Sequence, residues 1–403
     1  KWNQIIIIII WQDKFMEFNL NQTQLSIIDS VNNIMKNYND EYWLQCDKES
    51  QFPQKFYEEV ANGGWLGICM PKEFGGSDLG VSEASIFMQK ISETGGGMAA
   101  ASSIHINIFG PHPIVVYGTK EQKDKWLPPL ILGKEKTCFG VTEPDAGLDT
   151  GRLKTFAKKI NNGYLVNGQK IWTSTAKIAD KILLLARTSP IEECKKNTDG
   201  LTLFYTNLDR EKIEVREISK MGRAAVDSNQ IFIDNLEVPE FDRIGEEGKG
   251  FKYILDSLNP ERILIAAEAL GIGKNALSRA IKYANDRIVF NRPIGKNQSI
   301  QHPLAENWIE LEAAELLIAK AAYQYDKGEN AGGMANAAKY FAAEAGFKAA
   351  TQAVVTLGGM GYAKEYHVER LLRESLIPKL APVSAQMILN YISERVLGLP
   401  KSY

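Results

Sequence analysis

The amino-acid sequence predicts an α+β fold, in which helical segments precede and follow a smaller β-rich segment. Apolar residues recur every three or four positions as far as about Leu132, which is the spacing of one helix face. Short β-rich runs separated by turn signals fill about Thr137 to Arg243, and long segments rich in alanine and leucine follow from about Gly250. Because no long helix separates the β-rich runs, a parallel Rossmann sheet is disfavoured.

The order of these segments predicts three domains in a chain of 403 residues. The middle one is expected to be a small antiparallel β domain, and the last one a four-helix bundle. The expected ranges are 16–136 for the N-terminal helical domain, 137–245 for the β domain and 246–403 for the C-terminal helical domain.

The first residues do not fit this plan. An isoleucine run from Ile5 to Ile10 lies between Trp2 and Trp11, and it is too short to span a bilayer. The segment has neither a signal-peptide cleavage pattern nor the Arg- and Ser-rich character of a transit peptide. We expect residues 1–15 to be an extension outside the core, with Met16 as the true start.

Local signals place elements in each domain. Asn21 followed by Gln24 predicts a capping box at the start of an amphipathic helix. The side chains expected on its buried face are Leu25, Ile28, Val31, Met35 and Tyr38. In the β domain, the Asn-Asn-Gly sequence at 161–163 and the Asn-Gly pair at 167–168 are turn signals. The run from Ile263 to Leu270 is apolar on almost every side, which is typical of a buried helix.

Composition and charge exclude several classes of protein. Apolar residues make up 44% and charged residues 24% of the chain, as in ordinary globular proteins. The formal net charge of -2 does not favour nucleic-acid binding. Basic and acidic residues are interspersed, so the sequence has no polybasic patch that would bind a membrane. The cysteines form no CxxC pair and the histidines no HExxH spacing, so we expect reduced thiols and no metal. Reduced thiols fit a cytoplasmic protein, and the mitochondrial matrix is the alternative.

The common short fingerprints are absent from the sequence: no GxGxxG follows a predicted strand, and there is no P-loop, GxSxG or HExxH. Four longer segments stand in a specific order. They are FGVTEPDAG at 139–147, NGQKIWTS at 167–174, RIVF at 287–290 with Gln298 after it, and LGGMGY at 357–362. Together these segments resemble the acyl-CoA dehydrogenase family, and the resemblance extends over about Met16 to Tyr403.

The resemblance implies an FAD enzyme and assigns the residues that hold the flavin. In the family the first motif lies along the flavin ring, and the second places an aromatic ring and a hydroxyl group against it. The third reaches the FAD of a neighbouring subunit, where a guanidinium suits a diphosphate, and glycines of the fourth allow close backbone approach. The positions implied here are Phe139, Val141, Thr142, Trp172, Ser174, Arg287, Phe290, Gln298, Gly358, Gly359, Ser384 and Gln386. Taken singly, such residues are more often ordinary core, turn or surface residues.

The catalytic base departs from the most common pattern of the family. Arg373 upstream and the SAQM sequence at 384–387 downstream set the register, and the usual glutamate position is then Pro382. A minority of the family, including the isovaleryl and long-chain types, carries the base in a Glu-Arg pair. Glu261-Arg262 resembles that pair.

Local signals place Glu261 at the start of a helix, with Asn259 as the N-cap and Pro260 as the first helical residue. The apolar run that follows would raise the pKa of the carboxyl group by desolvation, whereas the helix N-terminus and Arg262 would lower it. The simpler interpretation is a first-turn glutamate that only complements the helix dipole. Weaker candidates for the base are Glu365, Glu369 and Glu374.

Two departures bear on substrate binding. Pro382 has no N–H with which to polarise a thioester carbonyl, a contact that contributes about 3 kcal/mol in comparable enzymes. Leu148 replaces a serine that touches the CoA arm in relatives, so Leu148 and Arg262 are the expected substrate contacts.

The sequence therefore predicts FAD-dependent α,β-dehydrogenation of an acyl-CoA to the trans-2-enoyl-CoA, in fatty acid or branched-chain acyl-CoA metabolism. Glu261 is the expected Cα-proton base and flavin N5 the hydride acceptor. Expected partners are the acyl-CoA substrate, an electron-transferring flavoprotein and further copies of the chain, in a homotetramer. Two alternatives stay open: a catalytically impaired homologue that only binds flavin or acyl-CoA, and an oxidase that passes electrons to oxygen.

Overall fold

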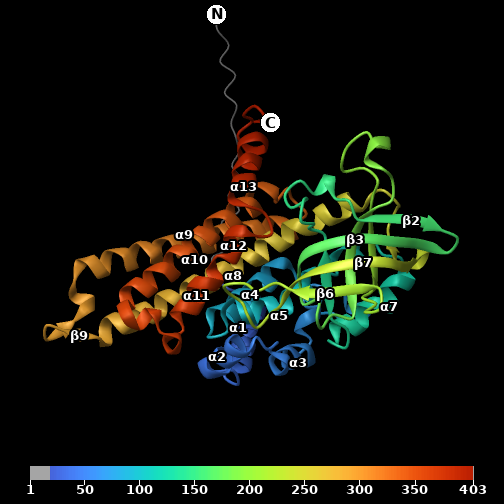
Figure 1. Cartoon of the computed structure of the whole chain (residues 1–403). Coiled ribbons are helices and arrows are strands. Elements are labelled where there is room, and N and C mark those ends of the chain that lie inside the picture. Colours follow the sequence, from blue (N-terminus) through green and yellow to red (C-terminus); the bar gives the residue numbers. More distant parts are fainter. Residues whose placement is uncertain (1–18, 403) are drawn as a thin grey trace, which may run out of the picture.

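The computed structural model describes residues 19–402, and the expected extension at 1–15 lies outside them. Helices and a β-sheet occupy separate parts of the molecule, with long C-terminal helices on one side and the sheet on the other (Figure 1). The order of helices, then strands, then helices confirms the α+β fold class. Among the residues described, no helix is long and apolar enough to cross a membrane.

The N-terminal part is helical. Its helices are α1 (Gln22–Met35), α2 (Asp40–Glu49), α3 (Gln54–Asn62), α4 (Val81–Glu93), α5 (Gly97–Phe109), α6 (His112–Tyr117) and α7 (Lys120–Ile131). The predicted capping box is present: the Asn21 side chain accepts from the N–H of Gln24, whose side chain accepts from the N–H of Asn21. Val31, Met35 and Tyr38 of the predicted face are buried, but Leu25 is exposed and Ile27 is buried instead.

The middle part is a β-sheet. Its strands are β1 (Thr137–Gly140), β2 (Phe156–Ile160), β3 (Gly163–Ser174), β4 (Lys181–Arg187), β5 (Leu201–Asn207), β6 (Ile213–Glu217), β7 (Ser228–Pro239) and β8 (Arg243–Ile244). The order across the sheet is β6-β7-β3-β2-β4-β5-β8, and β1 pairs with β4. Every side chain of β4 is buried, which explains why its sequence, KILLLAR, is almost continuously apolar.

Two predictions for the β domain need correction. Most strand pairs are antiparallel, but β4 pairs in parallel with β1 and with β2, so the domain is not purely antiparallel. The Asn167-Gly168 pair does not form a turn. It lies inside β3, where the pairing with β7 shifts between Val166 and Gly168. A β-bulge and a turn use the same residue types, since both need backbone angles that glycine tolerates.

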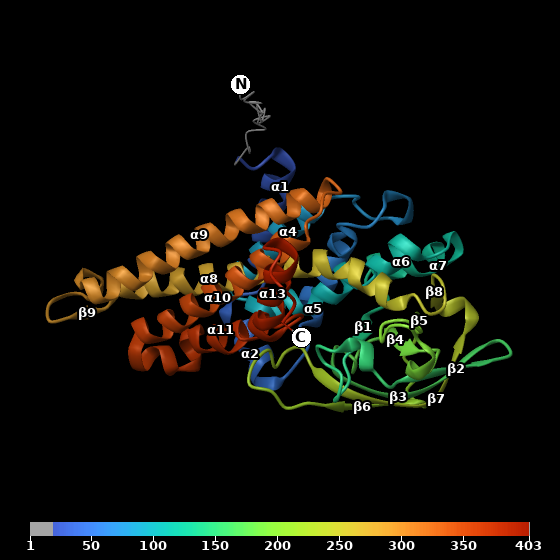
Figure 2. The same ribbon diagram turned by 90° about the horizontal axis from the view of Figure 1, so that it is seen from above.

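The C-terminal part is again helical. Its helices are α8 (Gly250–Asp286), α9 (Gln298–Asp326), α10 (Gly332–Leu357), α11 (Val368–Ser375), α12 (Ile377–Leu380) and α13 (Ala385–Tyr391). Strands β9 (Ile288–Val289) and β10 (Arg292–Pro293) form a hairpin between α8 and α9. Figures 1 and 2 both show α8, α9 and α10 side by side, with the hairpin at the end away from the sheet.

Helix α8 starts earlier than predicted. It begins at Gly250, and Pro260 lies inside it rather than at its first position after an Asn259 cap. A proline inside a helix removes one backbone donor and commonly marks an end, which is why the local signal points to the wrong boundary. The run from Ile263 to Leu270 is buried on all sides, as predicted.

Close packing places α8 at the centre of the helical parts. It packs against α4 and α5 of the N-terminal part and against α9 and α10 of the C-terminal part. Glycine permits the closest approach: a Cβ on Gly346 of α10 would lie 2.4 Å from the carbonyl oxygen of Ala269 in α8. The buried residues of the N-terminal and C-terminal helices form one continuous cluster. Helix α8 therefore carries Glu261 into that core.

Candidate active site

Glu261 is a buried carboxyl group on α8. The residue is 8% exposed, and its Oε2 atom has no hydrogen-bond partner among the described residues. Burial is the strongest influence on the group and raises its pKa to about 7. A carboxylate with this pKa can take up a proton near neutral pH, as a general base must. The start of α8 is about three turns away from Glu261. Contrary to the prediction, the helix N-terminus therefore does not lower the pKa of this carboxyl group.

Charged side chains from three helices surround Glu261. His105 of α5, Arg262 of α8 and Lys339 of α10 lower the pKa of its carboxyl group, whereas Glu268 raises it. These influences are weaker than burial, so the net shift is upward. Arg262 donates a 3.0 Å hydrogen bond to the side chain of Asn259, which lies on the preceding turn.

Lys339 connects this region to the loop that contains Pro382. Its side chain is buried, and its Nζ donates a 2.6 Å hydrogen bond to the carbonyl of Val383. Burial lowers the pKa of the Lys339 ammonium group to about 8. Since Lys339 also faces Glu261, the loop position that the usual base would occupy lies beside the same lysine. Pro382 supplies neither a carboxylate nor an N–H at that position.

The two segments expected to contact the flavin ring lie side by side. Just after β1, the carbonyl of Thr142 accepts a 2.9 Å hydrogen bond from the N–H of Ile171 in β3. The fully buried Lys170 donates to the carbonyl of Val141 at 3.1 Å and forms a 2.8 Å ion pair with Glu143. These bonds hold the first and second motifs at adjacent positions.

Aromatic contacts link this strand end to the surroundings of Glu261. Phe139 on β1 packs against Phe109 of α5, with 5.9 Å between ring centroids. The Phe109 ring in turn lies 4.5 Å from the ring of His105. Phe139 and the candidate base therefore belong to one region of the molecule.

Trp172 projects from a second bulge in β3. Pairing with β7 shifts between Lys170 and Thr173, and Trp172 has a φ of 61°, a left-handed conformation that is unusual for a bulky residue. Trp172 is 56% exposed. Two residues later, the hydroxyl of Ser174 accepts a 3.0 Å hydrogen bond from Arg223. A strained backbone that presents an exposed aromatic ring is typical of a binding site.

The third motif lies at the opposite end of the chain's long helices. Arg287 directly follows Asp286, the last residue of α8, and the helix from Glu261 to Asp286 spans about 38 Å. Phe290 is 95% exposed in the hairpin, and Gln298 begins α9. Figure 1 shows this hairpin at the end farthest from the sheet. Within one chain, the third motif is thus separated from Glu261 by the length of α8.

The remaining predicted contacts are dispersed. Gly358 and Gly359 are exposed in the 3-10 segment Gly358–Tyr362 after α10. The Ser384 side chain caps α13, and Gln386 is exposed on that helix. Leu148 is exposed in the loop between β1 and β2.

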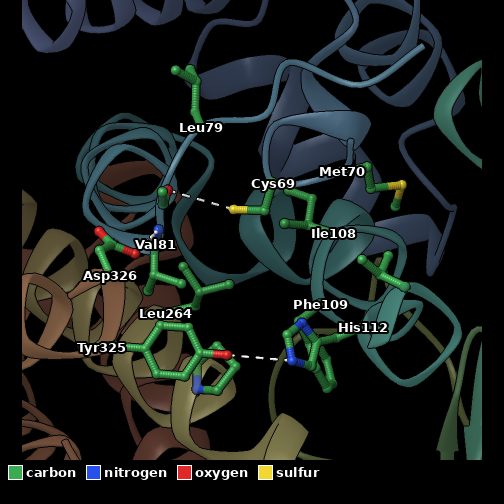
Figure 3. Close-up of a pocket in the computed structure, with 13 residues that line it drawn as sticks. Cys69, Met70, Leu79, Val81, Ile108, Phe109, His112, Leu264, Tyr325 and Asp326 are labelled. Atoms are coloured by element: carbon green, nitrogen blue, oxygen red, sulfur yellow. Dashed lines mark hydrogen bonds between the residues drawn. The ribbon is translucent and has the colours of Figure 1, made fainter. Parts of the chain in front are cut away.

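Figure 3 shows a cavity of about 140 Å³ that α8 lines close to Glu261 in the sequence. From α8 it is lined by Pro260 and Leu264, the residue before Glu261 and the residue one turn after it. On its wall the hydroxyl of Tyr325 lies 3.3 Å from Nε2 of His112. The other lining residues are mostly apolar: Cys69, Met70, Leu79, Gly80, Val81, Ile108, Phe109, Val115 and Asp326.

Comparison with known protein families now identifies the fold. Three descriptions match in order: acyl-CoA dehydrogenase N-terminal domain over residues 21–134, middle domain over 138–236 and C-terminal domain over 248–397. This chain belongs to the acyl-CoA dehydrogenase family.

Several relatives and solved structures match nearly the whole chain. Acyl-CoA dehydrogenase FadE12 of Mycobacterium tuberculosis is 35% identical over 373 residues, which are 91% of this chain and 94% of that protein. The caffeyl-CoA reductase-Etf complex subunit CarC of Acetobacterium woodii is 33% identical over 354 residues, 88% of this chain and 92% of CarC. The solved butyryl-CoA dehydrogenase from Megasphaera elsdenii has a TM-score of 0.90 at 29% identity, covering 95% of this chain and 100% of that chain.

Acyl-CoA dehydrogenases are FAD-dependent oxidoreductases, and this chain shares their fold. Sequence reasoning did not single out Lys170, Lys339, His105 or Arg223, which the structure places next to predicted site residues. Three of them had a usable signal. Lys170 stands inside the second motif, and His105 and Lys339 are ionisable residues in helices whose side chains are mostly small or apolar. A polar residue in a buried helix needs a partner, which makes it informative.

Proposed function

We propose that this member of the family oxidises the Cα–Cβ bond of an acyl-CoA thioester to the trans-2-enoyl-CoA, with Glu261 as the base. The observation that carries the proposal is the burial of Glu261, which raises the pKa of its carboxyl group to about 7. A carboxylate sheltered from water and poised near neutrality suits removal of a weakly acidic Cα proton. The competing candidate Glu374 is already engaged, because it accepts from the N–H of Met98 and pairs with Arg370.

The strand end beside Glu261 suits an FAD ring. The exposed indole of Trp172 offers a flat face, while Thr142 and Ser174 offer hydroxyl and main-chain groups nearby. Bound FAD would accept a hydride from Cβ at its N5 atom. The chain's own contribution is to hold the ring against Phe139 and Val141, to orient the thioester and to take the Cα proton.

The loop at Pro382 favours a second candidate function. A proline there cannot donate to the thioester carbonyl, and the loop is held in place from its carbonyl side by Lys339. The absence of this donor is expected of a homologue that binds flavin and acyl-CoA without turnover. We favour the enzyme because Glu261 keeps the burial that a base requires.

We propose an electron-transferring flavoprotein as the redox partner. By its name, the relative CarC belongs to a complex with Etf. CarC is also a reductase by name, and the same residues would serve the reverse reaction, because a group that removes the Cα proton also returns it. The direction of the reaction then depends on the redox partner rather than on Glu261.

We further propose that a second copy of the chain completes each FAD site, in a homotetramer. Arg287 and Phe290 are separated from Glu261 by the length of α8, about 38 Å from Glu261 to the end of the helix, so they cannot close the same pocket in one chain. A guanidinium and an exposed ring at the tip of a hairpin are well placed to reach a neighbouring molecule.

The test is anaerobic bleaching of the flavin absorbance in a single turnover, with a panel of short, branched and long acyl-CoAs. Glu261→Gln should keep FAD and acyl-CoA bound but slow bleaching by about 10² to 10⁴-fold, the usual contribution of a general base. Glu121→Gln, which changes a fully exposed carboxylate on α7, is the control and should bleach like the wild type.

Three outcomes would change the proposal. A yellow wild type that binds acyl-CoA but never bleaches supports the binding homologue. Bleaching of Glu261→Gln at the wild-type rate contradicts the base assignment alone. Reoxidation by air as fast as by an electron-transferring flavoprotein indicates an oxidase.

A further inference from the structure

A buried histidine–glutamate pair lies next to the proposed base. Nδ1 of His105 and Oε1 of Glu268 are 2.5 Å apart, and both side chains are buried. His105 belongs to α5, whereas Glu268 stands two turns after Glu261 on α8. Residues seven positions apart lie on the same helix face, so Glu261 and Glu268 both point toward α5.

We propose that His105, held by Glu268, is a positioning residue for the proposed base: its imidazolium ring faces Glu261 and stabilises the ionised carboxylate. This inference rests on the proposed role of Glu261. It adds a residue that acts through the base and touches neither flavin nor substrate.

The geometry leaves one ring nitrogen of His105 for this role. Because Nδ1 is bound to Glu268, Nε2 points the other way, and it has no hydrogen-bond partner in the described part of the chain. Oε2 of Glu261 is likewise without one among residues 19–402. The two groups are close enough for each to shift the pKa of the other, upward for His105 and downward for Glu261.

The charge state of His105 follows from its partners. Burial favours the neutral ring, but the carboxylates of Glu268 and Glu261 outweigh burial, so the pKa of His105 is raised. Arg223, from the loop between β6 and β7, acts in the opposite direction. The imidazolium form is therefore favoured at a pH where a free histidine is already losing its proton.

The other charges around Glu261 do not replace His105. Arg262 is engaged with Asn259, and the Lys339 ammonium group is bound to the carbonyl of Val383. Glu268 opposes ionisation of Glu261. Without the positive charge on His105, Glu261 would therefore face a second carboxylate with only these two committed cations to compensate.

The test is an infrared titration of the Glu261 carboxyl group in the holoenzyme, with the protonated C=O band assigned by its loss in Glu261→Gln. In His105→Gln the midpoint should rise by about one unit or more, because a neighbouring opposite charge is lost. His105→Lys restores a positive charge and should bring the midpoint back toward the wild-type value. No turnover is needed, so an inactive enzyme does not affect the result.

His112→Gln is the matched control. His112 is a half-buried histidine of the adjoining helix α6 that pairs with Tyr325, and the charge that acts on it is that of Asp256. Its substitution should leave the midpoint unchanged. An unchanged midpoint in His105→Gln, or equal midpoints in His105→Gln and His105→Lys, overturns the proposal.

A second measurement needs no substitution at His105. Nitrogen-15 resonances of labelled histidine in the wild type, assigned by the spectrum of His112→Gln and by elimination, report the charge of each ring. His105 should be an imidazolium throughout the range in which Glu261 titrates. A neutral His105 ring in that range overturns the proposal even if the His105 variants fail to fold.

Discussion

Several ionisable residues of the proposed site are buried, where their charged forms are disfavoured. Glu261, Glu268 and Lys339 lie in the core between α5, α8 and α10. Burial raises the pKa of Glu261 and lowers that of Lys339, so the charged form of each is penalised. Lys339 is partly compensated by its hydrogen bond to Val383, whereas Oε2 of Glu261 has no such bond among the residues described. The stability of the protein is therefore expected to depend on pH through Glu261.

Glu261→Gln should stabilise the folded protein most at alkaline pH. The pKa of the carboxyl group is 4.5 in a model peptide and about 7 when folded. Between these values the folded state binds more protons than the unfolded state, so the free energy of unfolding of the wild type falls as the pH rises. From about pH 5 to about pH 8 this group should remove about 2 to 3 kcal/mol, which the glutamine variant does not lose.

Urea unfolding of both holoenzymes at the two pH values measures this effect. The stability of Glu261→Gln relative to the wild type should be higher at the alkaline pH by that amount. The same difference at both pH values would show that Glu261 titrates normally in the folded protein.

Elements of different domains depend on one another through a shared cap. Asp326, the last residue of α9, accepts hydrogen bonds from the N–H groups of Val81 at 2.7 Å and Ser82 at 2.9 Å, at the start of α4. It also accepts from the hydroxyl of Ser82 at 2.6 Å. Gly80, which precedes α4, has no side chain to do this, and a Cβ there would lie 2.6 Å from Oδ2 of Asp326. A C-terminal helix thus caps an N-terminal one.

Asp326→Ala should lower the free energy of unfolding by about 2 to 3 kcal/mol, since two charge-assisted backbone bonds and a favourable helix-dipole contact are lost. Asp326→Asn keeps one acceptor oxygen and should lose about half of that. Chemical unfolding curves compare these variants with Asp124→Ala, which removes an exposed pair with Lys120 and should change stability by less than about 1 kcal/mol. Equal losses for Asp326→Ala and Asp124→Ala would mean that the cap contributes nothing.

Helix α8 organises the whole molecule. Glu261 lies within this helix, which ends directly before Arg287. The rigid length of the helix keeps these two groups apart. If both serve FAD chemistry, as proposed, each active site must combine α8 of one copy with the hairpin of another. Activity then belongs to the assembly rather than to a single chain.

Co-expression of Glu261→Gln and Arg287→Ala chains tests this arrangement. Each variant alone should be impaired, with FAD affinity about 10- to 100-fold weaker in Arg287→Ala, because a charged hydrogen bond is lost. In a mixed pair, one site combines an intact Glu261 with an intact Arg287, so bleaching activity should return. Arg292→Ala, on the same hairpin and hydrogen-bonded to Asn297, is the control and should be active alone.

The mixed oligomers are isolated with two affinity tags, and their mass is measured by light scattering. A mixed assembly that stays inactive would show that Arg287 does not complete a site on a neighbouring chain.

Much of the fold was readable from the sequence because its signals are local. The capping box at Asn21 and Gln24 and the buried run from Ile263 to Leu270 follow from residue spacing, which reports the face that a helix buries. The change from helical to strand periodicity and back predicted the order of the elements. Glu261 and the flavin motifs were candidates from their resemblance to a family, before any distance was known.

Local signals failed where one residue type serves two purposes. Pro260 lies inside α8 and Asn167-Gly168 inside β3, although proline and Asn-Gly more often mark ends and turns. Packing against neighbouring elements decides between a kink and an end, or between a bulge and a turn. That packing involves residues far away in the sequence.

Only the tertiary structure decided the surroundings of Glu261. His105, Glu268 and Lys339 come from three helices, and burial among them sets the pKa of the carboxyl group. Only the structure, too, showed that the length of α8 separates Arg287 from Glu261. Charges act through space and not along the chain, so their effects depend on which helices the fold brings together.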